Sequence, residues 1–319
     1  MTNSILLVAG GLVLLALGGE FLVRGAVGMA ARLGISPLLA GLTIVGFGTS
    51  TPELATSVQA ALGGAPGIAV GNVVGSNIAN ILLILGVSAL VLPLTVNPAS
   101  FQRDSLAMGG SALLCTGAVL LGVIGPVSGA VLLTCLVGYV LWAYKSESAA
   151  PCPEGARHEA EAEDRPVPPN TGPAILIGMI IAGLVAAIFG AGMLVDGAVV
   201  LASAAGVSES VIGLTVVAVG TSLPELIACV VAVIRKHEDV ALGNIVGSNI
   251  YNIFGILGIT ALITPIEVPA EIAQIDIWVM LGVTLLLIVQ LRSGWKLSRI
   301  EGGVLLALYC AYTAFLALR

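Results

Sequence analysis

Apolar runs long enough to cross a lipid bilayer recur along most of this chain of 319 residues. A helix needs about 20 mainly apolar residues to span the hydrocarbon core. Ten such segments are predicted, at 4–23, 36–62, 69–92, 105–124, 127–144, 173–195, 208–234, 240–263, 276–291 and 301–318. A soluble helical protein would need polar helix faces. These are missing, because 58% of the residues are hydrophobic and only 9% are charged. The sequence therefore predicts an all-α integral membrane protein with ten transmembrane helices.

The two halves of the chain repeat each other. The stretch GLTIVGFGTSTPEL matches GLTVVAVGTSLPEL, and GNVVGSNIANILLILG matches GNIVGSNIYNIFGILG. Between Gly41–Gly86 and Gly213–Gly258, 25 of 46 positions are identical without a gap. Five spans per half is an odd number, so the second copy should enter the membrane upside down. Two inverted five-helix repeats are typical of secondary transporters, whose substrate site lies at the repeat interface.

A hydrophilic segment rich in Pro, Ala and Glu separates the two halves. It has almost no apolar residues to bury, which predicts a disordered or loosely helical cytoplasmic linker. The predicted organisation is a first repeat at 1–144, the linker at 145–172 and a second repeat at 173–319.

The basic residues predict the orientation in the membrane. If the N-terminus lies outside, eleven of the twelve Lys and Arg residues fall in gaps that face the cytoplasm, and Arg319 is the exception. The repeat partners Arg24 and Asp196 agree, because the basic residue falls on the inner side and the acidic residue on the outer side. Both termini are therefore predicted outside.

A proline interrupts the second span and its repeat counterpart, the seventh. Pro52 and Pro224 lack an N–H group, and each ring clashes with the carbonyl group four residues back. Each helix should therefore break near the middle of the membrane and free carbonyl oxygens around residues 46–49 and 218–221. Such oxygens are tolerated at this depth only where they are buried in protein or line a cavity.

A glutamate follows each of these prolines. Placing a charged carboxylate at the centre of a membrane helix costs at least about 2.5 kcal/mol. We therefore expect Glu53 and Glu225 to face a polar site that holds a cation or a proton. Carboxylate, carbonyl and hydroxyl oxygens are the ligands that hard ions such as Ca²⁺ and Na⁺ prefer. Neighbouring hydroxyl residues offer more of them: Thr49, Ser50, Thr221 and Ser222.

The second repeated motif, GNVVGSNIAN and GNIVGSNIYN, supplies further oxygen atoms. Ser76 and Asn80 are four residues apart and share one helix face, as do Ser248 and Asn252. We expect this face to line the site. The asparagine that directly follows each of these serines is expected to form hydrogen bonds between helices.

These motifs resemble the two alpha-repeats of the sodium/calcium exchanger family, prokaryotic type, within the cation/calcium antiporter superfamily. The residues that carry the resemblance are GTSTPEL with GSNIANI and GTSLPEL with GSNIYNI. It implies a secondary active antiporter, not an enzyme, that exchanges Na⁺ for Ca²⁺ electrogenically by alternating access. It implies no resident cofactor, and its partners would be Ca²⁺, Na⁺ and the lipid bilayer, with no nucleic acid and no protein partner. The chain carries no organelle signal, so the plasma membrane of a prokaryote is the expected location.

The resemblance also implies a ligand set, a central calcium site with adjacent sodium sites. Glu53 and Glu225 would be shared ligands, helped by the main-chain oxygens of Thr49 and Thr221. The hydroxyl ligands, mainly for sodium, would be Ser50, Ser222, Ser76 and Ser248. One departure is that Asn80 and Asn252 are both neutral, whereas potassium-dependent relatives and some sodium-coupled ones carry Asp at the position of Asn252.

Three other functions compete with Na⁺/Ca²⁺ exchange as interpretations of these residues. A Ca²⁺/H⁺ antiporter could use the same glutamates, but such relatives usually carry Gly-Asn-x-x-Glu where this chain has Gly-Thr-Ser-x-Pro-Glu. A passive cation channel would arrange the same oxygens along a continuous pore. An intramembrane enzyme is disfavoured, because the spans contain no His-Glu-x-x-His motif, paired aspartates or Ser/His pair.

Overall fold

The computed structural model describes residues 2–148, 168, 171–205 and 218–318. Nearly all of these residues are helical. Seven of the described helices are long and apolar enough to cross a membrane: Thr2–Leu33, Pro66–Val91, Pro126–Ser146, Pro173–Ala204, Glu238–Ile263, Ile272–Gly294 and Arg299–Leu318. Two shorter apolar helices are Pro37–Thr49 and Leu223–Ile234. The described part of the chain is therefore mostly helical, with several apolar helices long enough to span a membrane.

The surface is apolar where a soluble protein would be polar. Large apolar side chains such as Val127, Phe189 and Val289 are exposed on the long helices. Glu53 and Glu225 are instead buried at 2% and 1% exposure. This distribution fits a protein surrounded by lipid, with its polar chemistry inside.

The first half is a series of helices, some of which contain a π-helical stretch (η) or a break. In order they are α1 (Thr2–Leu33), α2 (Pro37–Ala40), η1 (Gly41–Val45), α3 (Gly46–Thr49), α4 (Thr51–Leu62), α5 (Pro66–Ala79), η2 (Asn80–Leu85), α6 (Gly86–Val91), α7 (Pro98–Leu120) and α8 (Pro126–Ser148).

The second half follows the same order. Its described elements are α10 (Pro173–Ala204), α12 (Ala218–Thr221), α13 (Leu223–Ile234), α14 (Glu238–Tyr251), η5 (Asn252–Leu257), α15 (Gly258–Ile263), η6 (Ile272–Asp276), α16 (Ile277–Gly294) and α17 (Arg299–Leu318). Four consecutive elements, α13 to α15, have bounds that lie 172 residues after those of α4 to α6. The sequence repeat is therefore also a repeat of local structure.

The helix bounds extend some of the predicted spans. Helices α1 and α10 run to Leu33 and Ala204, well past the predicted ends at 23 and 195. The helices therefore continue through the charged and polar residues near those predicted ends. A tilted helix can be longer than the hydrocarbon core is thick. Helix α8 continues into the predicted linker as far as Ser148. Most of the linker, and residues 208–217 of the seventh predicted span, lie outside the described residues.

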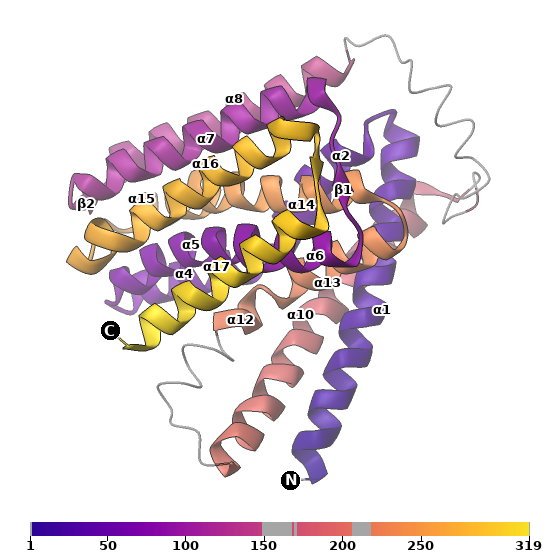
Figure 1. Ribbon diagram of the computed structural model, residues 1–319, viewed down its shortest axis with the longest axis horizontal. Helices are drawn as coiled ribbons and strands as arrows, with labels where there is room; N and C mark the ends of the chain where they lie inside the picture. The colour runs from indigo at the N-terminus through magenta and orange to yellow at the C-terminus, as the bar shows by residue number, and fades with distance from the viewer. Residues whose placement is uncertain (1, 149–167, 169–170, 206–217, 319) are drawn as a thin grey trace.

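Two faces of the molecule are distinguished below. On the linker face, α8 ends and α10 begins; on the distal face, α4 ends and α5 begins (Figure 1). Each face also has a short antiparallel strand pair made by both halves. Strand β1 (Leu94–Thr95) pairs with β4 (Lys296–Leu297), and β2 (Val123–Ile124) pairs with β3 (Ile266–Glu267).

Helices α1 and α10 lie side by side along most of their length (Figure 1). Glycines allow their backbones to approach closely: a Cβ atom built on Gly18 would be 2.8 Å from the carbonyl oxygen of Gly183. The reciprocal Cβ on Gly183 would be 2.7 Å from the carbonyl oxygen of Gly18. The two helices therefore form a smooth, close pair beside the helices that carry the repeated motifs.

Candidate cation-binding site

Both proline-containing helices break one residue before the helical turn that carries the proline. Ser50 separates α3 from α4 with φ −81° and ψ 8°, and Ser222 separates α12 from α13 with φ −93° and ψ 8°. Pro52 and Pro224 occupy the first turns of α4 and α13, where a missing N–H group is tolerated. The predicted breaks are confirmed, and each sits at the serine of the repeated Gly-Thr-Ser motif.

The carbonyl oxygen of Gly46 does not match the expectation of a free oxygen. It accepts hydrogen bonds from the Ser50 N–H at 3.2 Å, the Ser248 hydroxyl at 3.2 Å and the Thr49 hydroxyl at 3.4 Å. The prediction is therefore wrong for Gly46, because a backbone N–H and hydroxyl groups from both halves already donate to this oxygen. Pro52 has no N–H to donate to the carbonyl oxygen of Gly48, but the Ser50 N–H is directed at that oxygen as well as at Gly46.

The two glutamates lie in the first turns of α4 and α13, where the positive end of the helix dipole favours negative charge. The Ser50 hydroxyl donates to Glu225 Oε1 at 3.1 Å, which joins the break in one half to the carboxylate of the other. The second carboxylate oxygens, Glu53 Oε2 and Glu225 Oε2, are buried and accept no hydrogen bond from the described residues. Each glutamate thus presents one oxygen atom to the interior without a donor.

The asparagines of the second motif hold the two halves together. Asn77 Nδ2 donates to the carbonyl oxygen of Asn249 at 3.3 Å, and Asn80 Nδ2 donates to Asn249 Oδ1 at 3.0 Å. In the reverse direction, Asn252 Nδ2 donates to Asn77 Oδ1 at 3.1 Å. The predicted hydrogen bonds between helices are confirmed for Asn77 and Asn249.

This network determines which atoms of Asn80 and Asn252 remain available. Their amide nitrogens are engaged, while their Oδ1 atoms are buried and have no donor among the described residues. Helix α4 packs against η5, and α13 packs against η2. Two carboxylate oxygens and two amide oxygens without donors therefore lie on elements that contact each other. Burying unpaired acceptors, above all charged ones, is costly unless a cation or proton satisfies them.

The predicted hydroxyl residues differ in their access to a cavity. Thr49, Ser50, Ser222 and Ser248 are buried in the interior. Ser76 is also buried, at 6% exposure, but it lines a cavity of about 440 Å³ together with Thr221. All ten predicted site residues belong to the broken helices or to the α5–η2 and α14–η5 pair. Their roles as ligands stay predictions.

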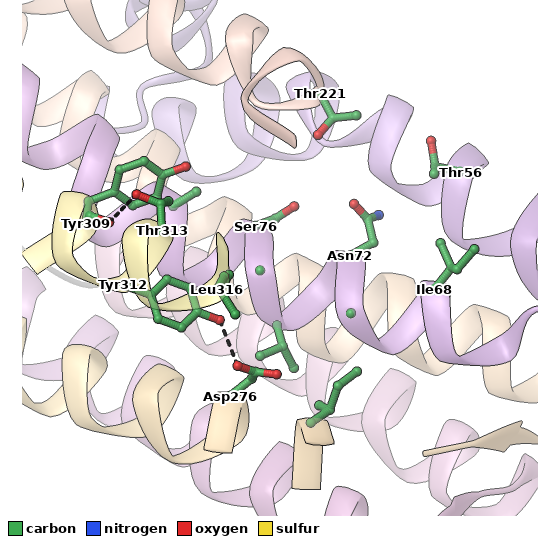
Figure 2. A pocket seen from close by; sticks show the side chains of 15 residues that line it. Thr56, Ile68, Asn72, Ser76, Thr221, Asp276, Tyr309, Tyr312, Thr313 and Leu316 are labelled. Carbon is green, nitrogen blue, oxygen red and sulfur yellow. Dashed lines mark hydrogen bonds between the residues drawn. The ribbon is translucent and has the colours of Figure 1, made fainter. Parts of the chain in front are cut away.

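The cavity lies toward the distal face. Ser76 and Asn72 point into it from α5, with Thr221 across from them (Figure 2). Helix α17 and the last residue of η6 line its other side, where the Tyr312 hydroxyl donates to Asp276 Oδ1 at 3.0 Å (Figure 2). The cavity therefore lies on the distal side of two of the predicted site residues, Ser76 and Thr221.

Sequence reasoning missed two asparagines that support the glutamates. Asn72 Nδ2 donates to the carbonyl oxygen of Glu53 at 3.1 Å, and Asn244 Nδ2 donates to that of Glu225 at 3.3 Å. Asn244 Oδ1 also accepts from the Thr49 hydroxyl of the other half at 3.3 Å. The signal was present in the sequence, because this asparagine opens both copies of the GNxVGSN motif.

Comparison with known proteins gives consistent matches along the chain. The family described as "Sodium/calcium exchanger protein" matches residues 3–145 and 175–318. The sodium/calcium exchanger MaX1 of Methanosarcina acetivorans is 34% identical, with 99% of each chain covered. The inner membrane protein YrbG of Escherichia coli is 36% identical, with 86% of this chain and 85% of YrbG covered. The solved structure of the sodium-calcium exchanger NCX_Mj soaked with zero Na⁺ and Ca²⁺ superposes with a TM-score of 0.83 at 32% identity, covering 98% of this chain and 99% of NCX_Mj.

Proposed function

Since the chain belongs to the sodium/calcium exchanger family, whose members are transporters and not enzymes, we propose that it exchanges Na⁺ for Ca²⁺ across the membrane. The proposed site is formed by Glu53, Glu225, Asn80 and Asn252. Ser50, Ser222, Ser76, Ser248 and the main-chain oxygens of Thr49 and Thr221 would complete the coordination of Na⁺ and Ca²⁺.

The single observation that supports this proposal most strongly is the set of four buried oxygen atoms without donors. Each half contributes one glutamate and one asparagine oxygen. An all-oxygen set with two carboxylates suits Ca²⁺ and Na⁺, which are hard cations. Asparagine amides whose nitrogens are fixed by other hydrogen bonds can only offer their oxygens.

The mechanism proposed is competition for these two carboxylates. One Ca²⁺ balances two negative charges, and adding a full set of Na⁺ at the same time would leave excess positive charge in a poorly solvated interior. The ions therefore take turns. More than two Na⁺ per Ca²⁺ would make the exchange electrogenic, as the family resemblance implies.

The proposal includes ten spans arranged as two inverted five-helix repeats. Its support is the matching order of elements in the two halves. With five spans in each half, an odd number, the second half would enter the membrane from the side opposite to the first. The linker face is assigned to the cytoplasm of a prokaryote, and the distal face to the outside, because of the distribution of Lys and Arg.

Alternating access is proposed to come from movement of α1 and α10 against the helices that carry the site. The pair has close backbone contacts at its glycines, so it can move as a unit. The cavity that reaches Ser76 and Thr221 from the distal face corresponds to access from the outside.

Uptake of ⁴⁵Ca²⁺ by proteoliposomes tests the proposal. Vesicles loaded with Na⁺ and diluted into Na⁺-free medium should accumulate Ca²⁺, equally well with K⁺ or choline as the background ion. Asn252 lacks the full charge that would recruit K⁺ as an additional ion. Vesicles without a Na⁺ gradient should accumulate little Ca²⁺.

The other outcomes of this experiment identify the alternatives. Uptake driven by a proton gradient but not by Na⁺ would indicate a Ca²⁺/H⁺ antiporter. Non-saturable Ca²⁺ flux without any counter-ion would indicate a channel. Either result contradicts Na⁺/Ca²⁺ exchange.

A further inference from the structure

An ion-pair cluster joins α1 to the end of α13 on the linker face. Arg235, directly after α13, donates from both Nε and Nη2 to the carboxylate of Glu20 on α1, with Nε 3.0 Å from Oε2. Arg24, one turn further along α1, donates to the same carboxylate. The Glu20 side chain is 23% exposed and the Arg235 side chain 49% exposed, so the contact is partly solvated, but its two-point geometry is stronger than that of a single surface contact.

The cluster connects the helix proposed to move with a helix that carries the site. Glu20 belongs to α1, whereas Arg235 follows α13, whose first turn contains Glu225. Next to the ion pair, a Cβ atom on Gly19 would meet Ile227 at 2.8 Å, so α1 and α13 are in close contact there. Separation of α1 from this end of α13 would therefore require Glu20 and Arg235 to part.

The repeat counterpart of this cluster cannot form an ion pair. At an offset of 172 residues, Glu20 corresponds to Gly192, Arg24 to Asp196 and Arg235 to Gly63. Glycine has no side chain to pair. A cavity of about 220 Å³, lined by residues that include Gly192 and Asp196, lies between α10 and the proline-containing turns of the two broken helices.

A second pair of repeat positions also forms a contact on the linker side but not on the distal side. Thr49 and Asn244, on the linker side of the helix break, are hydrogen bonded and fully buried. Their counterparts, Thr221 and Asn72, line the larger cavity on the distal side (Figure 2). The linker side of the site is thus closed by contacts between the halves, while the distal side is accessible.

We propose that Glu20 and Arg235 form a latch that keeps the linker face closed and favours the distal-open state. This inference rests on the proposed function, because it assumes that α1 moves during exchange. When the latch opens, Arg24 stays with Glu20 on the same helix, so the carboxylate remains compensated. Because only one repeat carries the latch, the two access states differ in free energy even with identical ions on both sides.

Side-specific transport measurements test the latch. Apparent Ca²⁺ affinity is measured separately from the distal and linker faces, in vesicles of both orientations, for Glu20→Gln and Arg235→Gln. Each variant should shift the ratio of the two affinities by about twofold to tenfold toward the linker face. The double variant should shift it no further than the single variants, since both remove the same contact.

A matched control is Arg292→Gln, an exposed basic residue in the last turn of α16, which ends at the linker face. It should leave the ratio unchanged. The latch would be overturned if the affinity ratio is unchanged in Glu20→Gln and Arg235→Gln, or if it shifts no more than in Arg292→Gln. It would also be overturned if the shifts of the two single variants add up in the double variant.

Hydrogen exchange provides a readout that does not depend on transport. Without ions, Glu20→Gln should speed amide exchange in residues 231–237 relative to wild type, while Arg292→Gln should not. Unchanged exchange there would also contradict the latch. If wild type shows this protection but no Na⁺-driven ⁴⁵Ca²⁺ uptake, the proposed function fails and the contact between α1 and α13 stands.

Discussion

At the residue scale, the site depends on which atoms are already engaged in hydrogen bonds. Asn80 and Asn252 could in principle present nitrogen or oxygen to the interior. Their nitrogens donate to Asn249 and Asn77, so only oxygen remains. The two carboxylate oxygens of Glu225 differ in the same way. Ser50 donates a hydrogen bond to Oε1, whereas no described residue donates to Oε2. The contacts that the two halves make with each other thus decide which oxygen atoms of these similar motifs are available to the proposed cation.

Replacing either glutamate should abolish exchange. Glu53→Gln and Glu225→Gln keep the side-chain volume but remove one of the two charges that hold a divalent ion. A charge pair about 4 Å apart is worth about 4 kcal/mol at an effective dielectric near 20. Loss of half of this would weaken Ca²⁺ binding more than tenfold. The measurement is Na⁺-driven ⁴⁵Ca²⁺ uptake, with equilibrium Ca²⁺ binding alongside.

The control for the glutamates is Glu267→Gln, because Glu267 is exposed in β3. It should exchange ions like wild type. Near-normal transport by both site variants would rule out a site made of two carboxylates.

The supporting asparagines should differ in importance. Asn244 is fully buried and contacts Glu225 and Thr49, so Asn244→Leu leaves the Thr49 hydroxyl without this partner. Asn72 is half-buried beside the cavity, where water can replace its lost contacts. We expect Asn244→Leu to raise the half-saturating Ca²⁺ concentration several-fold more than Asn72→Leu. Equal effects in ⁴⁵Ca²⁺ titrations would contradict this ranking.

At the element scale, the two copies of the second motif have the same sequence pattern but different surroundings. Helix α14 packs tightly on η1: a Cβ atom on Gly247 would lie 2.1 Å from the carbonyl oxygen of Leu42. The equivalent Gly75 on α5 lines the cavity and has no described atom within 4 Å of a built Cβ. One repeat therefore uses its glycines for close helix packing, and the other leaves them at an accessible surface.

This difference predicts that the same substitution destabilises the protein in one repeat and has little effect in the other. Gly247→Ala should push α14 away from η1 and lower the free energy of unfolding by about 1–3 kcal/mol, the usual cost of overpacking. Gly75→Ala should change the thermal midpoint little. Thermal unfolding of the purified variants in detergent makes the comparison, and a similar loss of stability in both would show that the packing difference is not real.

At the scale of the whole molecule, apolar residues face outward and the polar motifs of both halves meet inside. The ion pair between Glu20 and Arg235 and the cavities on the distal side make the two faces unequal. An exchanger needs such a difference between its two sides in each of its states. The repeat produces two similar halves. The residues that differ between the halves give one face an ion pair and leave cavities on the other.

The orientation of the molecule can be tested with reporters. In the predicted ten-span topology, eleven of the twelve basic residues fall on one side, so the linker should be cytoplasmic and both termini outside. A reporter that is active only in the cytoplasm should be active when fused after Ala150 and inactive after the C-terminus. The reverse pattern would contradict both the orientation and the inverted-repeat arrangement.

The sequence by itself determined the membrane class, the repeat, the two helix breaks and the residues of the candidate site. These follow from local properties: apolar length, the missing N–H of Pro52 and Pro224, and the high cost of an ionisable Glu53 or Glu225 in lipid. Only the tertiary structure decided how these groups share hydrogen bonds. It showed that the Gly46 carbonyl oxygen is engaged, that Asn72 and Asn244 support the glutamates, and that one side of the site is closed. The physical reason is that each of these facts depends on contacts between residues from different helices, and for Gly46 from different halves, which no local pattern specifies.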